Sequence, residues 1–204
     1  FTESSGLQRQ PVLYMQASPA DSPRVVIDPQ QLSPDGSLAC GDYAVSPDGR
    51  WVSYNASKGG ADVGEMRVRD LVSGRDRADV VHGAWSGATW TFDGGGYFYM
   101  RPPEPRPGEP PGAPRLEKQL LYHTLGSAQS SDRLVHAWTD ARWLYSMMSD
   151  DGRFAIIVTE RGSTSRMYVM DLGNPRGPNL AAPVVPLLAD RAARYHPMGT
   201  GGTT

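Results

Sequence analysis

The side chains of this sequence that could carry hydrolytic chemistry are its serines, histidines and aspartates. The nucleophilic serine of an α/β-hydrolase lies in a Gly-x-Ser-x-Gly turn between a strand and a helix. Residues 83–87 read GAWSG, which has the wrong spacing, and residues 162–165 read GSTS, which lacks the second glycine. Neither segment precedes a predicted helix. We therefore interpret these serines as loop residues and identify no catalytic residue.

The histidines and the single cysteine do not form a metal-binding pattern. The four histidines are His82, His123, His136 and His196, and no two are spaced as His-x-x-x-His. Cys40 has no second cysteine to share a zinc ion with. We expect no metal and, because no glycine-rich loop opens a helix, no cofactor. His123 falls within a predicted strand, where a packed or surface histidine is the ordinary case.

Four aspartates recur in a Ser/Thr-x-Asp-Gly pattern, at Asp35, Asp48, Asp93 and Asp151. Paired carboxylates could indicate glycoside hydrolysis. These four instead occupy equivalent positions in separate repeats, where an aspartate accepts hydrogen bonds from its own turn. We therefore predict that they shape turns.

The elements around these turns repeat as well. Asp-Gly between two apolar runs is a strong hairpin signal, and an alternating third segment and an apolar fourth segment follow three of the turns. The predicted third strands span 65–71, 119–125 and 166–172, and the predicted fourth strands span 78–81, 132–135 and 184–188. Four antiparallel strands describe one blade of a β-propeller. The predicted fold is therefore all-β, with about three complete blades and partial ones.

The predicted organisation follows the spacing of the turns. We expect the end of a blade in 1–30, complete blades in 43–83, 87–138 and 146–190, and the start of another in 191–204. Residues 1–30 contain two predicted strands, 11–15 and 24–27, without a leading partner strand. The segment 101–115 holds seven prolines in fifteen residues, so we predict an extended surface loop there. A ligand for a proline-binding module is the alternative for this segment.

Composition narrows the classes of function. The net charge is −2 and the pI is about 6.1, which gives no reason to expect a nucleic acid or an anionic membrane as partner. No run of eighteen apolar residues could span a membrane. A lone cysteine favours a reducing compartment, so we predict a cytoplasmic location. The abrupt ends suggest a part of a larger protein.

Several segments resemble the N-terminal propeller of prolyl oligopeptidase, a family of serine peptidases. The matching segments are 6–14 (GLQRQPVLY), 27–29 with 32–36, 43–50 (YAVSPDGR), 90–94 (WTFDG), 122–132 (YHTLGSAQSSD) and 149–153. The resemblance implies a seven-bladed propeller that restricts access of peptides to an α/β-hydrolase domain. That domain would cleave short peptides after proline with a Ser-Asp-His triad, and nothing in this chain matches it. The chain alone is therefore expected to be inactive. Oligopeptidase B is the second choice within the family.

The resemblance also implies three residues of a substrate pocket. Trp85 and Ser163 fall at pocket positions of the family, and Trp143 falls near a third. From the residues alone, packing in the core is favoured over lining a ligand site for any single tryptophan near a strand end. The alternative function is a non-enzymatic propeller that serves as a platform for protein interactions, of the WD-repeat or TolB type. The repeats lack a Trp-Asp signature, which disfavours this alternative.

Overall fold

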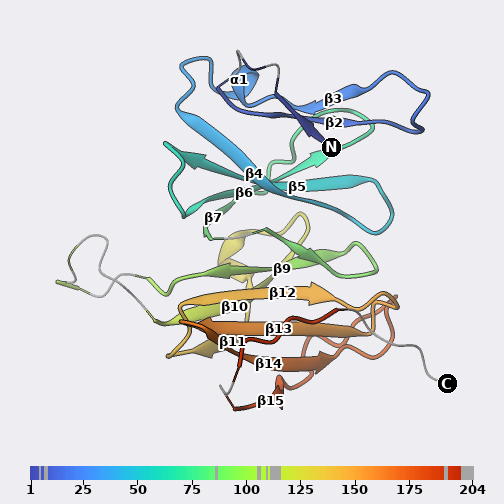
Figure 1. The fold of residues 1–204 in the computed structure, drawn as a ribbon. Helices are drawn as coiled ribbons and strands as arrows, with labels where there is room; N and C mark the ends of the chain where they lie inside the picture. The colour runs from blue at the N-terminus through green and yellow to red at the C-terminus, as the bar shows by residue number, and fades with distance from the viewer. Residues whose placement is uncertain are drawn as a thin grey trace.

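Four antiparallel sheets follow one another along the chain in the computed structural model, which describes residues 1–4, 6, 9–85, 87–104, 107–108, 110, 116–190 and 193–198 (Figure 1). Sheet 1 contains β1 (Thr2–Glu3), β2 (Val12–Met15) and β3 (Arg24–Ile27). Sheet 2 contains β4 (Leu38–Val45), β5 (Trp51–Lys58), β6 (Gly64–Asp70) and β7 (Val81–Ala84). Sheet 3 contains β8 (Thr89–Trp90), β9 (Gly96–Arg101), β10 (Lys118–Thr124) and β11 (Arg133–Trp138). Sheet 4 contains β12 (Trp143–Met148), β13 (Phe154–Arg161), β14 (Thr164–Asp171) and β15 (Val185–Leu188).

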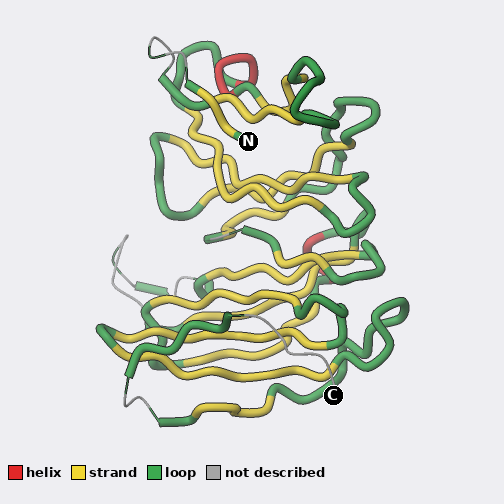
Figure 2. The backbone as a smooth tube through the Cα atoms, turned by 45° about the vertical axis from the view of Figure 1, so that its right-hand side comes forward, coloured by secondary structure: helices red, strands yellow, loops and turns green. Residues whose placement is uncertain are grey.

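Each sheet is an up-and-down meander, because strands that are consecutive in sequence are also neighbours in the sheet. The helical elements of the described residues are α1 (Pro29–Leu32) and the short 3₁₀ helix η1 (Gln129–Ser131) (Figure 2). The all-β prediction of successive four-stranded blades is thus confirmed. No helix of the described part of the chain is long and apolar enough to cross a membrane. The cytoplasmic location stays a prediction.

Several strands differ from the predicted ones, chiefly in sheets 1 and 2. β1 pairs with β2, so sheet 1 has the leading partner strand that the sequence analysis does not predict. β4 begins at Leu38, before the predicted start of its blade at residue 43, and absorbs a register shift between Gly41 and Ala44. Within that shift Asp42 has a φ of 52°, in the left-handed region that aspartate tolerates. The last strand of sheet 2 is β7, displaced toward the C-terminus from the predicted 78–81.

The Asp-Gly turns have the predicted role. In the turn between β4 and β5, the Gly49 amide donates to the Ser46 carbonyl at 2.8 Å, and Gly49 has a φ of 70°. The Asp48 carboxylate accepts from the Ser46 hydroxyl at 2.5 Å and from the Arg50 amide at 3.1 Å. The hydroxyl of Ser46 is the main reason that the pKa of Asp48 is lowered. Asp151 accepts in the same way from Ser149, with the same effect on its pKa.

Because the pKa values of these turn aspartates are lowered, we predict that the protein loses stability in acid. The Ser33 hydroxyl and the Ser37 amide lower the pKa of Asp35 to about 2. Because the folded-state pKa lies below the unfolded one, the stabilisation is present above about pH 4 and is lost as the pH falls toward 2. The triple variant Asp35→Asn, Asp48→Asn, Asp151→Asn should therefore show a shallower fall of the urea midpoint over this range than the unsubstituted protein. Parallel curves would contradict the assignment.

The sheets pack face to face, and strand alternation divides the aromatic residues between neighbouring cores. In β9, Tyr97 and Tyr99 face sheet 2, whereas Phe98 and Met100 face sheet 4. The residue alternation of a strand places successive side chains on opposite faces. Both faces of sheet 3 are therefore buried, which explains the continuous aromatic run after the Asp-Gly turn.

Hydrogen bonds join the first strands of adjacent sheets. The Trp90 indole N–H donates to the Ala44 carbonyl at 3.1 Å, which links β8 to β4. The Thr89 hydroxyl donates to the Ser146 carbonyl at 2.8 Å, which links β8 to β12. Sheets 2, 3 and 4 are thus held in one continuous stack.

Candidate functional site

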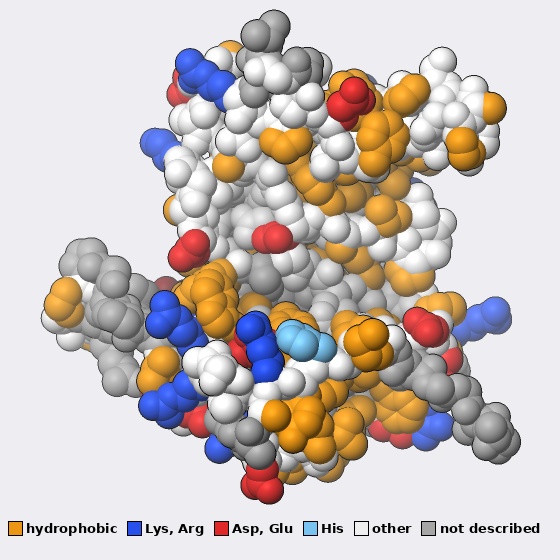
Figure 3. Space-filling view, viewed as in Figure 1, with side chains coloured by type: hydrophobic (Ala, Val, Ile, Leu, Met, Phe, Trp, Pro, Cys, Tyr) orange, Lys and Arg blue, Asp and Glu red, His pale blue; other side chains and the backbone are white. Residues whose placement is uncertain are grey.

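A cavity of about 910 Å³ lies at one end of the strands, where sheets 2, 3 and 4 meet. The second strand of each of these sheets ends at the cavity. The connections from one sheet to the next lie at the same end of the strands, because each strand of a meander runs opposite to the one before it. Figure 3 shows the molecule hollowed at the middle of one face, with acidic, basic, histidine and hydrophobic side chains around the hollow. The cavity walls mix both charges with aromatic rings, which is typical of a ligand site.

The aromatic part of the cavity is a tryptophan pair. Trp85, in the connection between β7 and β8, and Trp143, the first residue of β12, both line the cavity. Their rings pack edge to face, with centroids 5.5 Å apart and planes at 70°. The Trp85 amide donates to the Met100 carbonyl at 2.9 Å, which fixes the Trp85 backbone to the end of β9. Trp143 is 44% exposed, so its ring is accessible from solvent.

The charged part of the cavity contains a bidentate ion pair. The side chain of Glu160, at the end of β13, is 7% exposed, and its two oxygens accept from Arg194 at 3.1 and 2.7 Å. Arg194 belongs to the segment 193–198, whose Tyr195 amide donates to the Ser165 hydroxyl at 2.7 Å. The pair neutralises a carboxylate that would otherwise be costly to bury.

Two further residues of the cavity wall, Asn55 and Cys40, carry buried or partly buried polar groups. Asn55 is largely buried and its amide donates to the Ala84 carbonyl at 3.4 Å, whereas its Oδ1 lacks a partner among the described residues. Cys40 also lines the cavity. Burial raises the pKa of the Cys40 thiol to about 11, so the thiol stays protonated and is a poor nucleophile.

The structure brings together two of the three residues that the resemblance singles out. Trp85 and Trp143 are in contact, whereas Ser163 lies exposed in the turn between β13 and β14 and does not line the cavity. Sequence reasoning missed Lys118, Glu160, Arg194 and Asn55. Lys118 and Glu160 lie beside the ends of predicted strands. The sequence does not show that these ends face one cavity, because that depends on how the sheets pack against each other.

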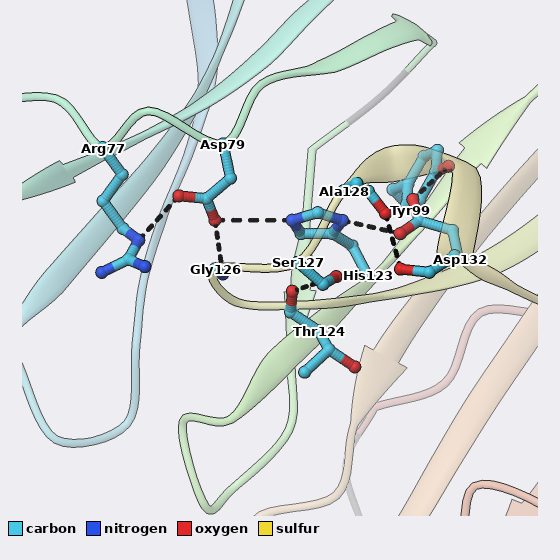
Figure 4. A network of polar contacts seen from close by, with 10 residues as sticks. Arg77, Asp79, Tyr99, His123, Thr124, Gly126, Ser127, Ala128 and Asp132 are labelled. Carbon is cyan, nitrogen blue, oxygen red and sulfur yellow. Dashed lines mark hydrogen bonds and ion pairs between the residues drawn. The ribbon is translucent and has the colours of Figure 1, made fainter.

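A second polar cluster lies at the other end of β10, around His123 (Figure 4). The His123 side chain is fully buried between two carboxylates: Nδ1 lies 2.7 Å from Asp132 and Nε2 lies 3.5 Å from Asp79. The Tyr99 hydroxyl donates to Asp132 at 2.8 Å, and Arg77 donates to Asp79 at 2.9 Å. Arg77 and Asp79 lie in the connection between β6 and β7 of sheet 2. Tyr99 and His123 lie in strands of sheet 3 and Asp132 directly precedes β11, so the cluster crosses the boundary between the sheets.

Burial and the neighbouring groups act in opposite directions on the pKa of Asp79, but in the same direction on the pKa of Tyr97, whose ring packs against His123. Burial works against the charged form of Asp79, but the Gly126 amide at 2.7 Å and the Arg77 guanidinium outweigh it and lower the pKa. Burial raises the pKa of the Tyr97 hydroxyl, and the carboxylates of Asp79 and Asp132 add to the effect. The cluster therefore favours the charged form of the Asp79 carboxylate inside the protein.

A glutamine side chain in the segment after β10 also makes hydrogen bonds to the backbone of β7. The Gln129 side chain accepts from the His82 amide at 2.9 Å and donates to the His82 carbonyl at 2.8 Å. It thereby satisfies both backbone groups of a residue in the outermost strand of sheet 2. The string 122–132 that carries the resemblance thus forms a polar connection between sheets 2 and 3.

The His123 cluster is built for packing and not for hydrolysis. Both ring nitrogens face carboxylates, and the nearby hydroxyls of Ser127 and Ser131 donate to the carbonyls of Thr124 and Ala128 (Figure 4). Within the described part of the chain, the hydrogen-bond partners of the two ring nitrogens are carboxylates and not a hydroxyl, so a Ser-His-Asp arrangement is not formed around His123. Across the described ranges, no group of three or more histidine, cysteine or acidic side chains could hold a metal ion.

Face-to-face four-stranded meanders joined at their inner strands, with a cavity at one end, define a β-propeller domain. Comparison with known families agrees with this class. The family model for the N-terminal β-propeller domain of prolyl oligopeptidase matches residues 1–204. The chain belongs to this family.

The similar proteins are peptidases. The prolyl endopeptidase of Elizabethkingia meningoseptica is 26% identical over 178 residues, which covers 85% of this chain and 25% of the relative. The dual function macrocyclase-peptidase of Galerina marginata is 30% identical over 192 residues, which covers 82% of this chain and 26% of the relative. The chain therefore spans about a quarter of the length of these relatives.

Solved structures show the same architecture. A prolyl endopeptidase structure matches with a TM-score of 0.72 and 30% identity, over 81% of this chain and 25% of that one. Prolyl oligopeptidase B from Galerina marginata, bound to a 35mer hydrolysis and macrocyclization substrate, matches with a TM-score of 0.83 over 98% of this chain and 31% of that one. At 24% identity the latter likeness shows the fold alone.

Proposed function

We propose that this chain is the propeller part of a serine peptidase that cleaves short peptides after proline. In this proposal the cavity at the ends of the strands contacts the peptide, and the propeller restricts access to a separate hydrolase domain. Membership of the prolyl oligopeptidase propeller family supports the proposal. The names of the relatives, which are prolyl endopeptidases and a macrocyclase-peptidase, support peptides as the substrate class.

The tryptophan pair is the observation that carries the proposal. A proline ring is apolar and compact, and it packs well against the face or edge of an aromatic ring. Trp85 and Trp143 offer such surfaces inside a cavity that also contains charged groups for the peptide backbone. Ser163, exposed in the nearby β13–β14 turn, is proposed to contact the peptide once it is bound.

The expected result is a tryptophan-dependent preference for proline. The chain should bind a fluorescently labelled peptide that contains proline more tightly than the same peptide with alanine in its place. Trp85→Ala should weaken binding of the proline peptide by about tenfold, as loss of a central aromatic contact does. Fluorescence anisotropy measures both affinities.

A matched control is Phe92→Ala, which removes a half-exposed aromatic residue from an Asp-Gly turn at the other end of the strands. This variant should bind the peptide like the unsubstituted chain. Equal affinities for the proline and alanine peptides, or equal losses in the two variants, would contradict the proposal.

Hydrolysis is assigned to a Ser-Asp-His triad outside the sequence described here. We therefore expect no turnover of proline-containing reporter peptides by these 204 residues alone. A Gly-x-Ser-x-Gly turn encoded further along the gene would support the peptidase. Further blades with no such turn would favour a non-enzymatic interaction platform.

A further inference from the structure

Lys118 is an unusual residue for this chain. The sequence contains eighteen arginines but only two lysines, Lys58 and Lys118. Lys58 is exposed at the end of β5, whereas Lys118 is 1% exposed at the start of β10. A lysine is rarely buried to this degree, because its ammonium loses hydration that the protein must replace.

The groups that replace the lost hydration of the Lys118 ammonium include an aromatic ring of the candidate site. The Lys118 Nζ lies 4.3 Å from the centroid of the Trp85 ring and donates to the Glu117 carbonyl at 3.3 Å. An ammonium over the face of an indole is attracted by the ring's negative face, and the attraction is strongest where water is excluded. The Trp85 backbone is held separately, by the Met100 carbonyl. The ring and its backbone therefore have two independent anchors.

We propose that Lys118 is a positioning residue for peptide binding, which holds the Trp85 ring in the orientation that packs against Trp143. One face of the Trp85 indole is occupied by the ammonium, and its contact with Trp143 is edge to face. In this arrangement, a bound apolar ring packs against the surface of the tryptophan pair that the Lys118 side chain does not cover. The peptide part of this inference rests on the proposed function, whereas the ring contact does not.

Two lysines make a direct test possible. With selectively isotope-labelled lysine, the chain gives one set of side-chain NMR signals for Lys118 and one for Lys58. Nuclei above an aromatic face are shielded, so the terminal methylene of Lys118 should resonate upfield of that of Lys58. The displacement should disappear in Trp85→Leu. Coincident signals in the unsubstituted chain, or a displacement that survives Trp85→Leu, would overturn the proposal.

A second experiment measures tryptophan packing and peptide binding in Lys118→Met and in Lys58→Met, the control at an exposed lysine. Methionine keeps the length of the lysine side chain but removes its charge, so Lys118→Met should change the near-ultraviolet circular dichroism of the tryptophan pair. It should also weaken binding of the proline peptide about fivefold, within the range of a buried cation–π contact. Lys58→Met should change neither. Unchanged dichroism and affinity in Lys118→Met would contradict the positioning role.

The two proposals fail differently. If the unsubstituted chain shows the upfield Lys118 signal but binds no proline peptide, the proposed function is wrong and the ring contact stands. If the peptide binds but the Lys118 signal coincides with that of Lys58, the positioning role is wrong. If Lys118→Met does not fold, the NMR comparison between the unsubstituted chain and Trp85→Leu still decides the contact.

Discussion

Asp132→Ala should lower the free energy of unfolding by about 3 kcal/mol, because it leaves two buried polar groups without their partner at about 1–3 kcal/mol each. The Asp132 side chain is 1% exposed, lies 2.7 Å from the His123 Nδ1 and accepts from the Tyr99 hydroxyl. Alanine would leave these two polar groups buried without their acceptor. Urea denaturation followed by tryptophan fluorescence measures the change.

The control for this prediction is Asp150→Ala, which removes a carboxylate that is exposed in the turn between β12 and β13. Its midpoint should stay close to that of the unsubstituted protein. Asp132→Asn keeps an acceptor oxygen and should therefore lie between the two alanine variants. An Asp132→Ala midpoint equal to that of Asp150→Ala would show that the His123 cluster does not stabilise the fold.

Gly96→Ala is the second substitution with a large expected effect. A Cβ at this first residue of β9 would overlap the His123 backbone carbonyl oxygen and would lie 2.6 Å from the Tyr122 hydroxyl. Because the nearer atom belongs to the backbone of β10, relief requires the two strands to separate. We expect a loss of about 3 kcal/mol, the upper part of the range for overpacking.

Gly41→Ala is the matched control, because it also lies in a strand and a Cβ there meets no atom within 4 Å. Thermal unfolding followed by far-ultraviolet circular dichroism compares the two variants. Gly96→Ala should unfold well below the unsubstituted protein, and Gly41→Ala close to it. Equal melting temperatures for the two variants would refute the close approach of β9 and β10.

The sequence predicts the sheets because their signals are local. The Asp48 and Asp151 turns and the alternation in β9 each involve residues within a few positions of one another, and strand spacing follows from them. The bulge at Asp42 was not predicted, because neither hydrophobic period nor turn pattern marks a single left-handed residue within a strand. β1 was missed because two residues are too few to show a period.

The candidate site was predictable only in part. Trp85 and Trp143 could be named through a family resemblance, but their contact could not be foreseen from residues 58 positions apart. Lys118 was missed for the same reason, since its partner Trp85 lies far from it in the sequence, in the connection between β7 and β8. His123 was expected to be an ordinary strand histidine. Asp132 is close to it in sequence, but Asp79 is 44 residues away and joins it only through sheet packing.

The bonds between Gln129 and His82 have a consequence for synthesis of the chain. Sheet 2 ends with β7 at Ala84, yet the backbone of its last strand is satisfied by a side chain 47 residues beyond His82. On a ribosome, the earlier sheet therefore waits with an open outer edge until residue 129 has emerged. An open edge of this kind can pair with another chain, so synthesis of residues 83–129 is a period in which this edge is exposed to aggregation.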